Sequence, residues 1–128
     1  MGGVRCGRCT DGLTILIVGD NAHAVESLIE ALRSAGAGVI AVRTARLALA
    51  YTERHPVDFI LIDLAEPSWW STAEFRALRA LNESPIYALR EAGAQPIDAA
   101  ARVTGVFAKP ISVDAVVAAL ASLPRRRR

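Results

Sequence analysis

The chain has 128 residues, of which 52% are hydrophobic and 22% are charged, and this composition is typical of one globular domain rather than of a disordered or fibrous chain. No apolar run reaches the roughly 18 residues that a membrane-spanning helix needs, and the amino terminus lacks the apolar core of a signal peptide, so we expect a cytoplasmic protein without a membrane partner. The formal net charge is +2, but four of the positive charges are the terminal arginines 125–128, and the rest of the chain carries −2. Such a body is not a basic phosphate-binding surface, so we expect no direct nucleic-acid binding by the domain.

The ends of the chain differ in composition from its middle. We predict a flexible amino-terminal extension over 1–12, one folded domain over 13–123 and a basic carboxyl-terminal tail over 124–128. The tail alone predicts only salt-sensitive, non-specific attraction to phosphates, and we interpret it as a solvated end or the start of a linker.

Both cysteines, Cys6 and Cys9, lie in the extension as a lone Cys-x-x-Cys pair. A zinc site needs four ligands, so the pair requires His23, His55 or a second chain to complete one. A redox motif of this kind joins a strand to a helix, whereas this pair precedes the first strand. We interpret the pair as reduced thiols in a mobile extension.

Short apolar runs alternate with segments of helical periodicity along the middle of the chain. The runs are rich in β-branched residues and predict strands buried on both faces. In chain order these strands are expected at 13–18, 39–42, 59–62, 85–89 and 106–108.

Apolar residues at helical spacing predict the helices that connect these strands. In chain order the helices are expected at about 25–32, 45–54, 72–81, 96–101 and 113–120. Thr44 is the expected N-cap of the second helix, and Ser71 or Thr72 begins the third. The fourth helix is expected to be short because Gly93 and Pro96 interrupt its pattern.

Five two-sided apolar strands that alternate with helices predict a parallel sheet covered on both faces. Right-handed crossovers favour a doubly wound α/β sheet of strand order 2-1-3-4-5, a flavodoxin-like (βα)5 three-layer sandwich. Ligands of such sheets bind at the carboxyl ends of the strands, near the switch point between the first and third strands. The charged residues that follow strand ends are Asp20, Asp63, Arg90 and Lys109.

Three of these residues have a joint chemistry. Asp20, Asp63 and Lys109 come from distant parts of the sequence and are expected to converge on one crevice. Two carboxylates suit a hard cation such as Mg²⁺, which prefers oxygen ligands. A carboxylate beside such a cation is a nucleophile toward phosphorus, and a lysine ammonium stabilises charge on the transferred group.

Over residues 13–123 the sequence resembles the receiver domains of two-component response regulators. The motifs that carry the resemblance are Ile-Val-Gly-Asp-Asn at 17–21, Leu-Ile-Asp-Leu-Ala-Glu-Pro at 61–67, and Lys-Pro at 109–110. The resemblance implies a phosphorelay in which a sensor histidine kinase or other signalling protein phosphorylates Asp63 in the presence of Mg²⁺. It makes Asp20 a metal ligand, Ala65 a backbone-carbonyl metal ligand and Lys109 the cation that contacts the phosphate.

The same resemblance implies a signalling module rather than an enzyme. Its output surface is expected on the fourth helix, fifth strand and last helix. The resemblance is compatible with a homodimer through this surface or through the first and last helices, and the Ala-rich segment 115–121 can equally pack within the chain. The Ile-Asp-Leu-Ala-Glu-Pro-Ser stretch at 62–68 is similar to the receivers of nitrate-responsive antitermination regulators. Those regulators carry RNA-binding ANTAR helices after the receiver, and this chain contains no such helices.

The sequence also departs from the family pattern. The first of the two acids that usually follow the first strand is Gly19 here, so we expect weakened Mg²⁺ binding. Arg90 stands where the family has the Ser or Thr of its switch, and Glu91 replaces a small residue. Val106 occupies the place of the switch aromatic, and Phe107, displaced by one, is expected to point to the opposite face of the strand.

These departures suggest an atypical receiver that acts by partner binding, with weakened or absent phosphorylation. Arg90 is expected to reach into the crevice and pair with Asp63 or Asp20, which would hold the domain in one state. The alternative within the family is a fully phosphorylatable, Mg²⁺-dependent receiver. The alternative outside it is an unrelated flavodoxin-like domain that binds a small ligand, but the glycines of a phosphate-cradling loop are missing after the first strand.

Each candidate residue also has a plain structural interpretation. Asp20 can be the N-cap of the first helix, Asp63 an ordinary strand-end residue, and Lys109 a surface cation. Trp69 and Trp70 are adjacent, so at most one of them is expected to be fully inward, and the other is a candidate contact for a partner.

Overall fold

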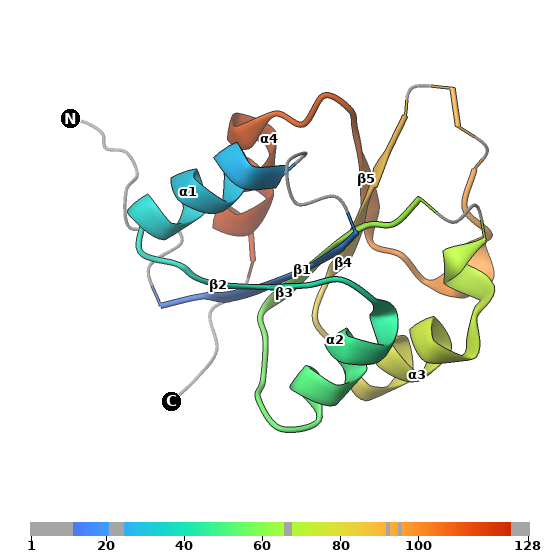
Figure 1. Ribbon diagram of the computed structural model, residues 1–128. Coiled ribbons are helices and arrows are strands. Elements are labelled where there is room, and N and C mark those ends of the chain that lie inside the picture. Colours follow the sequence, from blue (N-terminus) through green and yellow to red (C-terminus); the bar gives the residue numbers. More distant parts are fainter. Residues whose placement is uncertain (1–11, 21–24, 66–67, 92, 95, 124–128) are drawn as a thin grey trace.

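The computed structural model describes residues 12–20, 25–65, 68–91, 93–94 and 96–123 (Figure 1). Five parallel strands form one sheet in the order β2-β1-β3-β4-β5. The strands are β1 (Thr14–Gly19), β2 (Gly38–Val42), β3 (Phe59–Asp63), β4 (Ile86–Arg90) and β5 (Gly105–Ala108). Each lies within about one residue of its predicted apolar run, so the doubly wound α/β fold expected from the sequence is confirmed.

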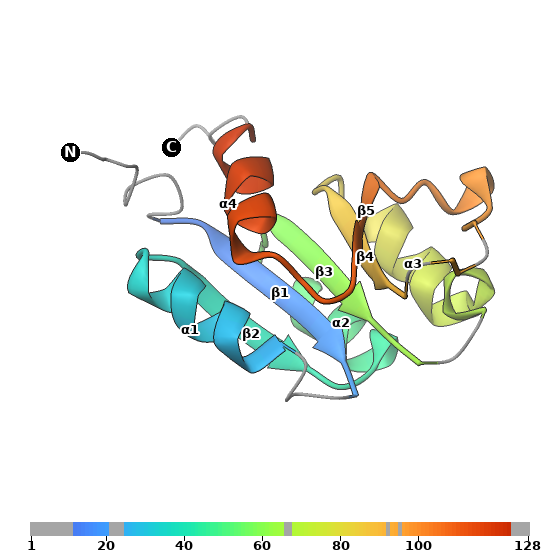
Figure 2. The same cartoon turned by 90° about the horizontal axis from the view of Figure 1, so that it is seen from above.

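Helices cover both faces of the sheet. α1 and α4 lie on one face and α2 and α3 on the other (Figure 1). The helices are α1 (Glu26–Ser34), α2 (Ala45–Thr52), α3 (Ala73–Leu81) and α4 (Val113–Ala121), with 3₁₀ turns η2 (Trp69–Ser71) and η3 (Ala99–Ala101). Figure 2, seen from the side of α1 and α4, shows the parallel strands side by side, with α2 and α3 behind the sheet.

Alternation along the central strands builds two separate cores. In β1, Ile15 and Ile17 pack with α1 and α4, whereas Leu16 and Val18 pack with α2 and α3. All four side chains are buried, and each contributes roughly 1.5–3 kcal/mol of transfer free energy. The two-sided apolar runs are therefore the reason that the sheet lies in the middle layer.

Side-chain caps begin three of the four helices. Thr44, Thr72 and Ser112 accept hydrogen bonds from the backbone N–H three residues later, at 3.1–3.2 Å. The predicted starts of α2 and α3 are thus confirmed. α1 differs, because Val25 is its N-cap and makes no side-chain bond. The interpretation of Asp20 as the N-cap of this helix is therefore wrong.

The connection between β4 and β5 departs most from the prediction. Where a short helix was expected from about Pro96, the described residues contain only the 3₁₀ turn η3. Asp98 caps this turn through the N–H of Ala100 at 3.0 Å, and Arg102 ends it in the left-handed region with φ of 57°. Because a non-glycine residue at positive φ cannot continue a helix, the segment turns into β5 at this point.

Arg79 of α3 holds this connection in place. Its guanidinium donates to the carbonyl oxygens of Arg102, Asn82 and Ser84 at 3.1, 2.8 and 2.8 Å. Burial, and secondarily the nearby charge of Arg102, lower the pKa of Arg79 from its usual value. Arg79 therefore joins α3 to the segments that lead into β4 and into β5, through their backbone carbonyls.

Among the described residues, no helix is both long and apolar enough to cross a membrane. The predictions for Cys6, Cys9, His23 and the arginine tail lie outside the described residues.

Candidate functional site

Asp63 is the last residue of β3, the strand at the centre of the sheet. Every residue of β3 is buried, and Asp63 is only 5% exposed. In the strand register Asp63 faces Gly19 of β1, and a Cβ atom at position 19 would lie 3.0 Å from the Asp63 carbonyl oxygen. The glycine therefore allows the close approach of the two strand ends that places Asp63 at the sheet's switch point.

Lys109 lies directly after β5 and reaches Asp63. Its Nζ is 2.8 Å from Asp63 Oδ1, a charge-assisted contact, and 3.8 Å from Glu91 Oε2. The backbone N–H of Lys109 donates to the Arg90 carbonyl oxygen at 2.8 Å, which ties the ends of β4 and β5 together. The predicted convergence of residues 63 and 109 is thus present in the structure.

The two oxygens of Asp63 differ in their surroundings. Oδ1 pairs with Lys109, whereas Oδ2 is buried without a hydrogen-bond partner among the described residues. An unsatisfied buried carboxylate oxygen is costly unless something binds it. Asp63 lines a hollow of about 370 Å³, so a ligand of the orphaned oxygen has space to enter beside it.

The residues at this edge fit a hard cation in part. Ala65 lines the same hollow as Asp63, whereas Asp20 is exposed immediately after Gly19 and is not among the residues that line this hollow. Two carboxylates, one of them with an orphaned oxygen, and a backbone carbonyl are the donors that Mg²⁺ prefers. No group of three or more His, Cys, Asp or Glu side chains gathers within the described part of the chain. The set therefore suits a cation that keeps several water ligands.

Arg90 does not lie where the sequence placed it. Its Cζ atom lies 5.0 Å from the centroid of the Trp70 ring, and Asp63 pairs with Lys109 instead. The prediction that Arg90 pairs with Asp63 or Asp20 is therefore wrong for this structure. The hypothesis that such a pair holds the domain in one state loses its support as well. A cation–π contact of this kind is worth about 0.5–1 kcal/mol at an exposed site.

The two tryptophans divide their roles as predicted. Trp69 is buried in the core beside α3, in edge contact with Phe75 at 5.1 Å. Trp70 is half-buried, lies edge-on to Trp69 at 5.4 Å and lines the hollow around Asp63. The sequence predicted that at most one tryptophan is fully inward but not which one, and a partner contact for the other stays a prediction. The pairing of Trp70 with Arg90 was missed, because no local pattern links residues twenty positions apart.

Val106 and Phe107 point to opposite faces of β5, as predicted. Phe107 stacks on Tyr87 at 4.8 Å, and Tyr87 stacks on Phe59 at 5.1 Å, on the side of α1 and α4. Val106 is 53% exposed. No aromatic ring therefore occupies the place of the family's switch residue on the Val106 side.

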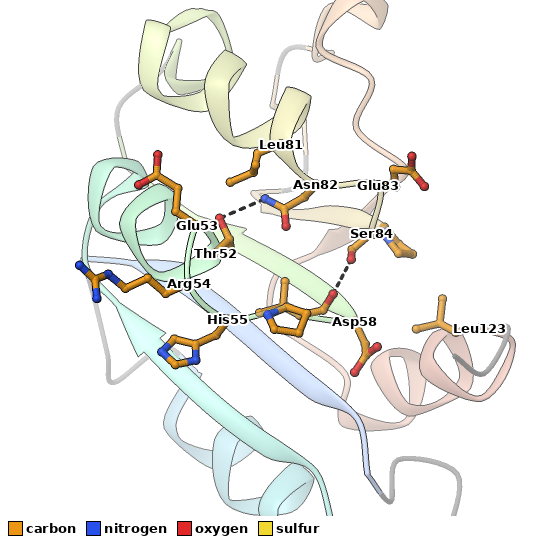
Figure 3. Close-up of a pocket in the computed structure, with 13 residues that line it drawn as sticks. Thr52, Glu53, Arg54, His55, Asp58, Leu81, Asn82, Glu83, Ser84 and Leu123 are labelled. Carbon is orange, nitrogen blue, oxygen red and sulfur yellow. Dashed lines mark hydrogen bonds between the residues drawn. The ribbon is translucent and has the colours of Figure 1, made fainter. Parts of the chain in front are cut away.

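A larger hollow, of about 730 Å³, lies at the other end of the sheet (Figure 3). It is bounded by the segments that lead into β3 and β4. Asn82 donates to Thr52 Oγ1 at 3.2 Å, and Ser84 donates to the Val57 carbonyl oxygen, across its floor. Because these polar groups satisfy one another, the smaller hollow around the orphaned Asp63 oxygen is the better candidate site.

Comparisons with solved structures decide the family. The receiver domain of a sensor histidine kinase from Pseudomonas aeruginosa, with a magnesium ion coordinated in its active-site cleft, is 31% identical to this chain, with a TM-score of 0.67; the match covers 85% of this chain and 94% of that one. The chain belongs to the receiver-domain family of response regulators. The further likeness to antitermination regulators stays a prediction.

Two other receivers agree with this assignment. The BeF₃-activated conformation of SdrG from Pseudomonas melonis is 28% identical with a TM-score of 0.66, over 84% of this chain and 92% of that one. A chemotaxis response regulator of Vibrio cholerae is 21% identical with a TM-score of 0.64, over 84% and 95%, and shows the fold alone. No family sequence model and no curated protein sequence matches the chain.

Proposed function

We propose that this receiver domain accepts a phosphoryl group on Asp63 and transmits the signal by binding a partner protein, with weaker Mg²⁺ binding than receivers that carry two adjacent acids after β1. The observation that carries the proposal is the state of the Asp63 carboxylate. One oxygen is held by Lys109 at 2.8 Å, and the other is buried without a partner beside an open hollow. This is the arrangement of a nucleophile poised at the switch point of a doubly wound sheet.

The transfer step follows from these contacts. Asp63 Oδ2 forms the new bond to phosphorus while the bond from phosphorus to the donor's leaving atom breaks, and the leaving group keeps that electron pair. The leaving atom is the imidazole nitrogen of a phosphorylated histidine kinase or the acetate oxygen of acetyl phosphate. Lys109 stays beside the acceptor and balances part of the charge on the transferred group. Mg²⁺, when bound by Asp20, Asp63 and the Ala65 carbonyl, supplies further neutralisation of the phosphoryl oxygens.

Two departures from the family make this receiver atypical. Gly19 removes one carboxylate from the outer ligands of the cation, which lowers the charge that attracts Mg²⁺. Arg90 removes the hydroxyl that pulls the usual switch. We infer slow, Mg²⁺-limited phosphorylation rather than a complete loss, because the Asp63–Lys109 pair is intact.

The surface that transmits the signal is also altered. On the face that carries the fourth helix in the family, the described residues form only the turn η3, and Val106 of β5 is exposed on this side. Pro96 and Ile97 line hollows on this same side. We infer that partners of this receiver bind a surface of different shape from the usual one, which favours a dedicated partner.

Incubation with acetyl phosphate and Mg²⁺, followed by intact-protein mass spectrometry, tests the proposal. We expect slow, incomplete addition of one phosphoryl group that disappears in Asp63→Asn and persists in Asp114→Asn, a control at an exposed carboxylate on α4. Labelling that survives in Asp63→Asn, or no labelling of the wild type, would contradict the acceptor role. Rapid stoichiometric labelling would instead support the fully competent receiver.

A further inference from the structure

We propose that Arg90 is the second phosphoryl-binding cation of this receiver, and that Trp70 holds its guanidinium until a phosphoryl group reaches Asp63. This inference rests on the proposed acceptor role of Asp63. It gives the arginine that replaces the family's switch hydroxyl a specific task, and it makes Trp70 a positioning residue for that task.

The geometry places all the required groups around one space. Asp63, Lys109, Arg90 and Trp70 all line the hollow at the carboxyl end of the sheet. β4, which Arg90 ends, is the direct neighbour of β3, which Asp63 ends, and neighbouring strands lie about 4.8 Å apart. The bond from Lys109 N–H to the Arg90 carbonyl holds the backbone of Arg90 beside the other cation. The long arginine side chain can therefore change partners without a change in the backbone.

Charge balance supplies the reason for the change of partner. Before phosphorylation the Asp63 carboxylate is balanced by the Lys109 ammonium at 2.8 Å, and Glu91 also draws on Lys109 at 3.8 Å. A phosphoryl group at Asp63 carries close to two negative charges, which exceeds what one shared lysine balances. Arg90 is the other cation lining this hollow among the described residues.

The resting contact of Arg90 is suited to release. A guanidinium over a partly exposed indole is held weakly, whereas an arginine fork on phosphoryl oxygens makes two charge-assisted hydrogen bonds. Transfer of Arg90 to the phosphoryl group uncovers the face of Trp70 that it occupied. Trp70 is joined through Trp69 to Phe75 of α3, so the change is passed to the side of the domain that carries α3.

Beryllofluoride with Mg²⁺ provides a stable stand-in for the phosphoryl group, and its occupancy at the site is read by fluorine NMR. Tryptophan fluorescence of the same samples reports on Trp70, because the chain has only two tryptophans and Trp69 is buried. We expect a fluorescence change in the wild type that follows the occupancy. The change should be lost in Trp70→Phe, which isolates the contribution of Trp69.

Substitution of the arginine gives an independent measurement. We expect Arg90→Gln to bind beryllofluoride about tenfold more weakly than the wild type and to lose the fluorescence change. Arg46→Gln, which removes an exposed arginine of α2 that lines neither this hollow nor the other one beside Trp70, should behave as the wild type. Circular dichroism of each variant confirms that it is folded.

The outcomes separate this inference from the acceptor role. Beryllofluoride occupancy without a change in Trp70 fluorescence, or equal affinity in Arg90→Gln and Arg46→Gln, would overturn the role of Arg90 and leave Asp63 as the acceptor. Absence of occupancy in the wild type would overturn both.

Discussion

β3 and β5 carry the two residues that meet at the site, yet they are built in opposite ways. All five residues of β3 are buried between two helix layers, whereas the residues of β5 alternate between half-buried and exposed at the edge of the sheet. Asp63 ends the central strand, and Lys109 follows the edge strand, where the described residues place no helix over the Val106 side. The proposed nucleophile thus ends a fully buried strand, and the cation that it pairs with follows a partly exposed one.

This difference shows which parts of the site depart from the family pattern. Apolar packing on both faces surrounds β3, and the departures lie beside it: Gly19 faces Asp63 in the strand register, Arg90 ends the neighbouring strand β4, and the turn η3 precedes β5. The proposed acceptor thus lies where packing dictates the backbone. Arg90, the proposed second cation, is half-buried and contacts the half-buried Trp70.

The largest effect is expected from truncation inside β3. Phe59→Ala should lower the free energy of unfolding by about 3–5 kcal/mol, because Phe59 is fully buried and stacks on Tyr87. Urea denaturation monitored by circular dichroism measures the loss. If this variant does not fold, Ile62→Val in the same strand should cost about 0.5–1.5 kcal/mol. A loss below about 1 kcal/mol in folded Phe59→Ala would show that β3 is not the constrained strand.

The next effect concerns the contact between the two regions. Asp63→Asn, Lys109→Met and the double variant form a cycle whose coupling free energy we expect to be about 1–2 kcal/mol, because Asp63 is buried while Lys109 is partly exposed. Denaturation of the four proteins gives the coupling. Additive losses would mean that the 2.8 Å pair contributes no measurable interaction in solution.

A smaller effect is expected when the missing acid is restored. Gly19→Asp should raise Mg²⁺ affinity about tenfold through the added carboxylate, while the new Cβ, 3.0 Å from the Asp63 carbonyl oxygen, forces a small local shift. Gly19→Ala introduces the same Cβ without the charge and is the matched control. Magnesium titrations followed by tryptophan fluorescence compare the two. Equal Mg²⁺ affinities in the two variants would show that the missing carboxylate at position 19 does not cause weak metal binding.

The smallest effect is expected at the exposed edge. Val106→Ala should change the free energy of unfolding by no more than about 0.5 kcal/mol, because Val106 is 53% exposed. The losses in free energy of unfolding of Val106→Ala and Phe59→Ala, measured under the same denaturation conditions, compare β5 with β3 directly. A loss comparable with that of Ile62→Val would show that the Val106 side is covered in solution.

The sequence predicted those features that repeat along the chain. Apolar runs located all five strands and their order, and the threonines at 44 and 72 marked two helix starts. The meeting of Asp63 and Lys109 also followed, because the carboxyl ends of parallel strands share one edge. These are consequences of periodicity and topology alone.

The features that the sequence did not predict depend on which of several nearby groups a side chain contacts in the folded domain. Arg90 has an acidic crevice and an indole within its surroundings, and no spacing in the sequence tells which one it contacts. The expected helix is replaced by the turn η3, which ends at Arg102 in the left-handed region. Arg79 of α3 binds the carbonyl oxygen of Arg102 and so holds this end of the turn. Tertiary contacts of this kind override local propensity and cannot be derived from it.

Chemical mapping of the phosphorylated residue tests the central claim most directly. Treatment with acetyl phosphate and Mg²⁺, trapping of acyl phosphate by borohydride reduction, and peptide mass spectrometry locate the modified side chain. We predict conversion of residue 63 to homoserine, with every other Asp and Glu unchanged. Modification at another carboxylate with Asp63 intact would contradict the account.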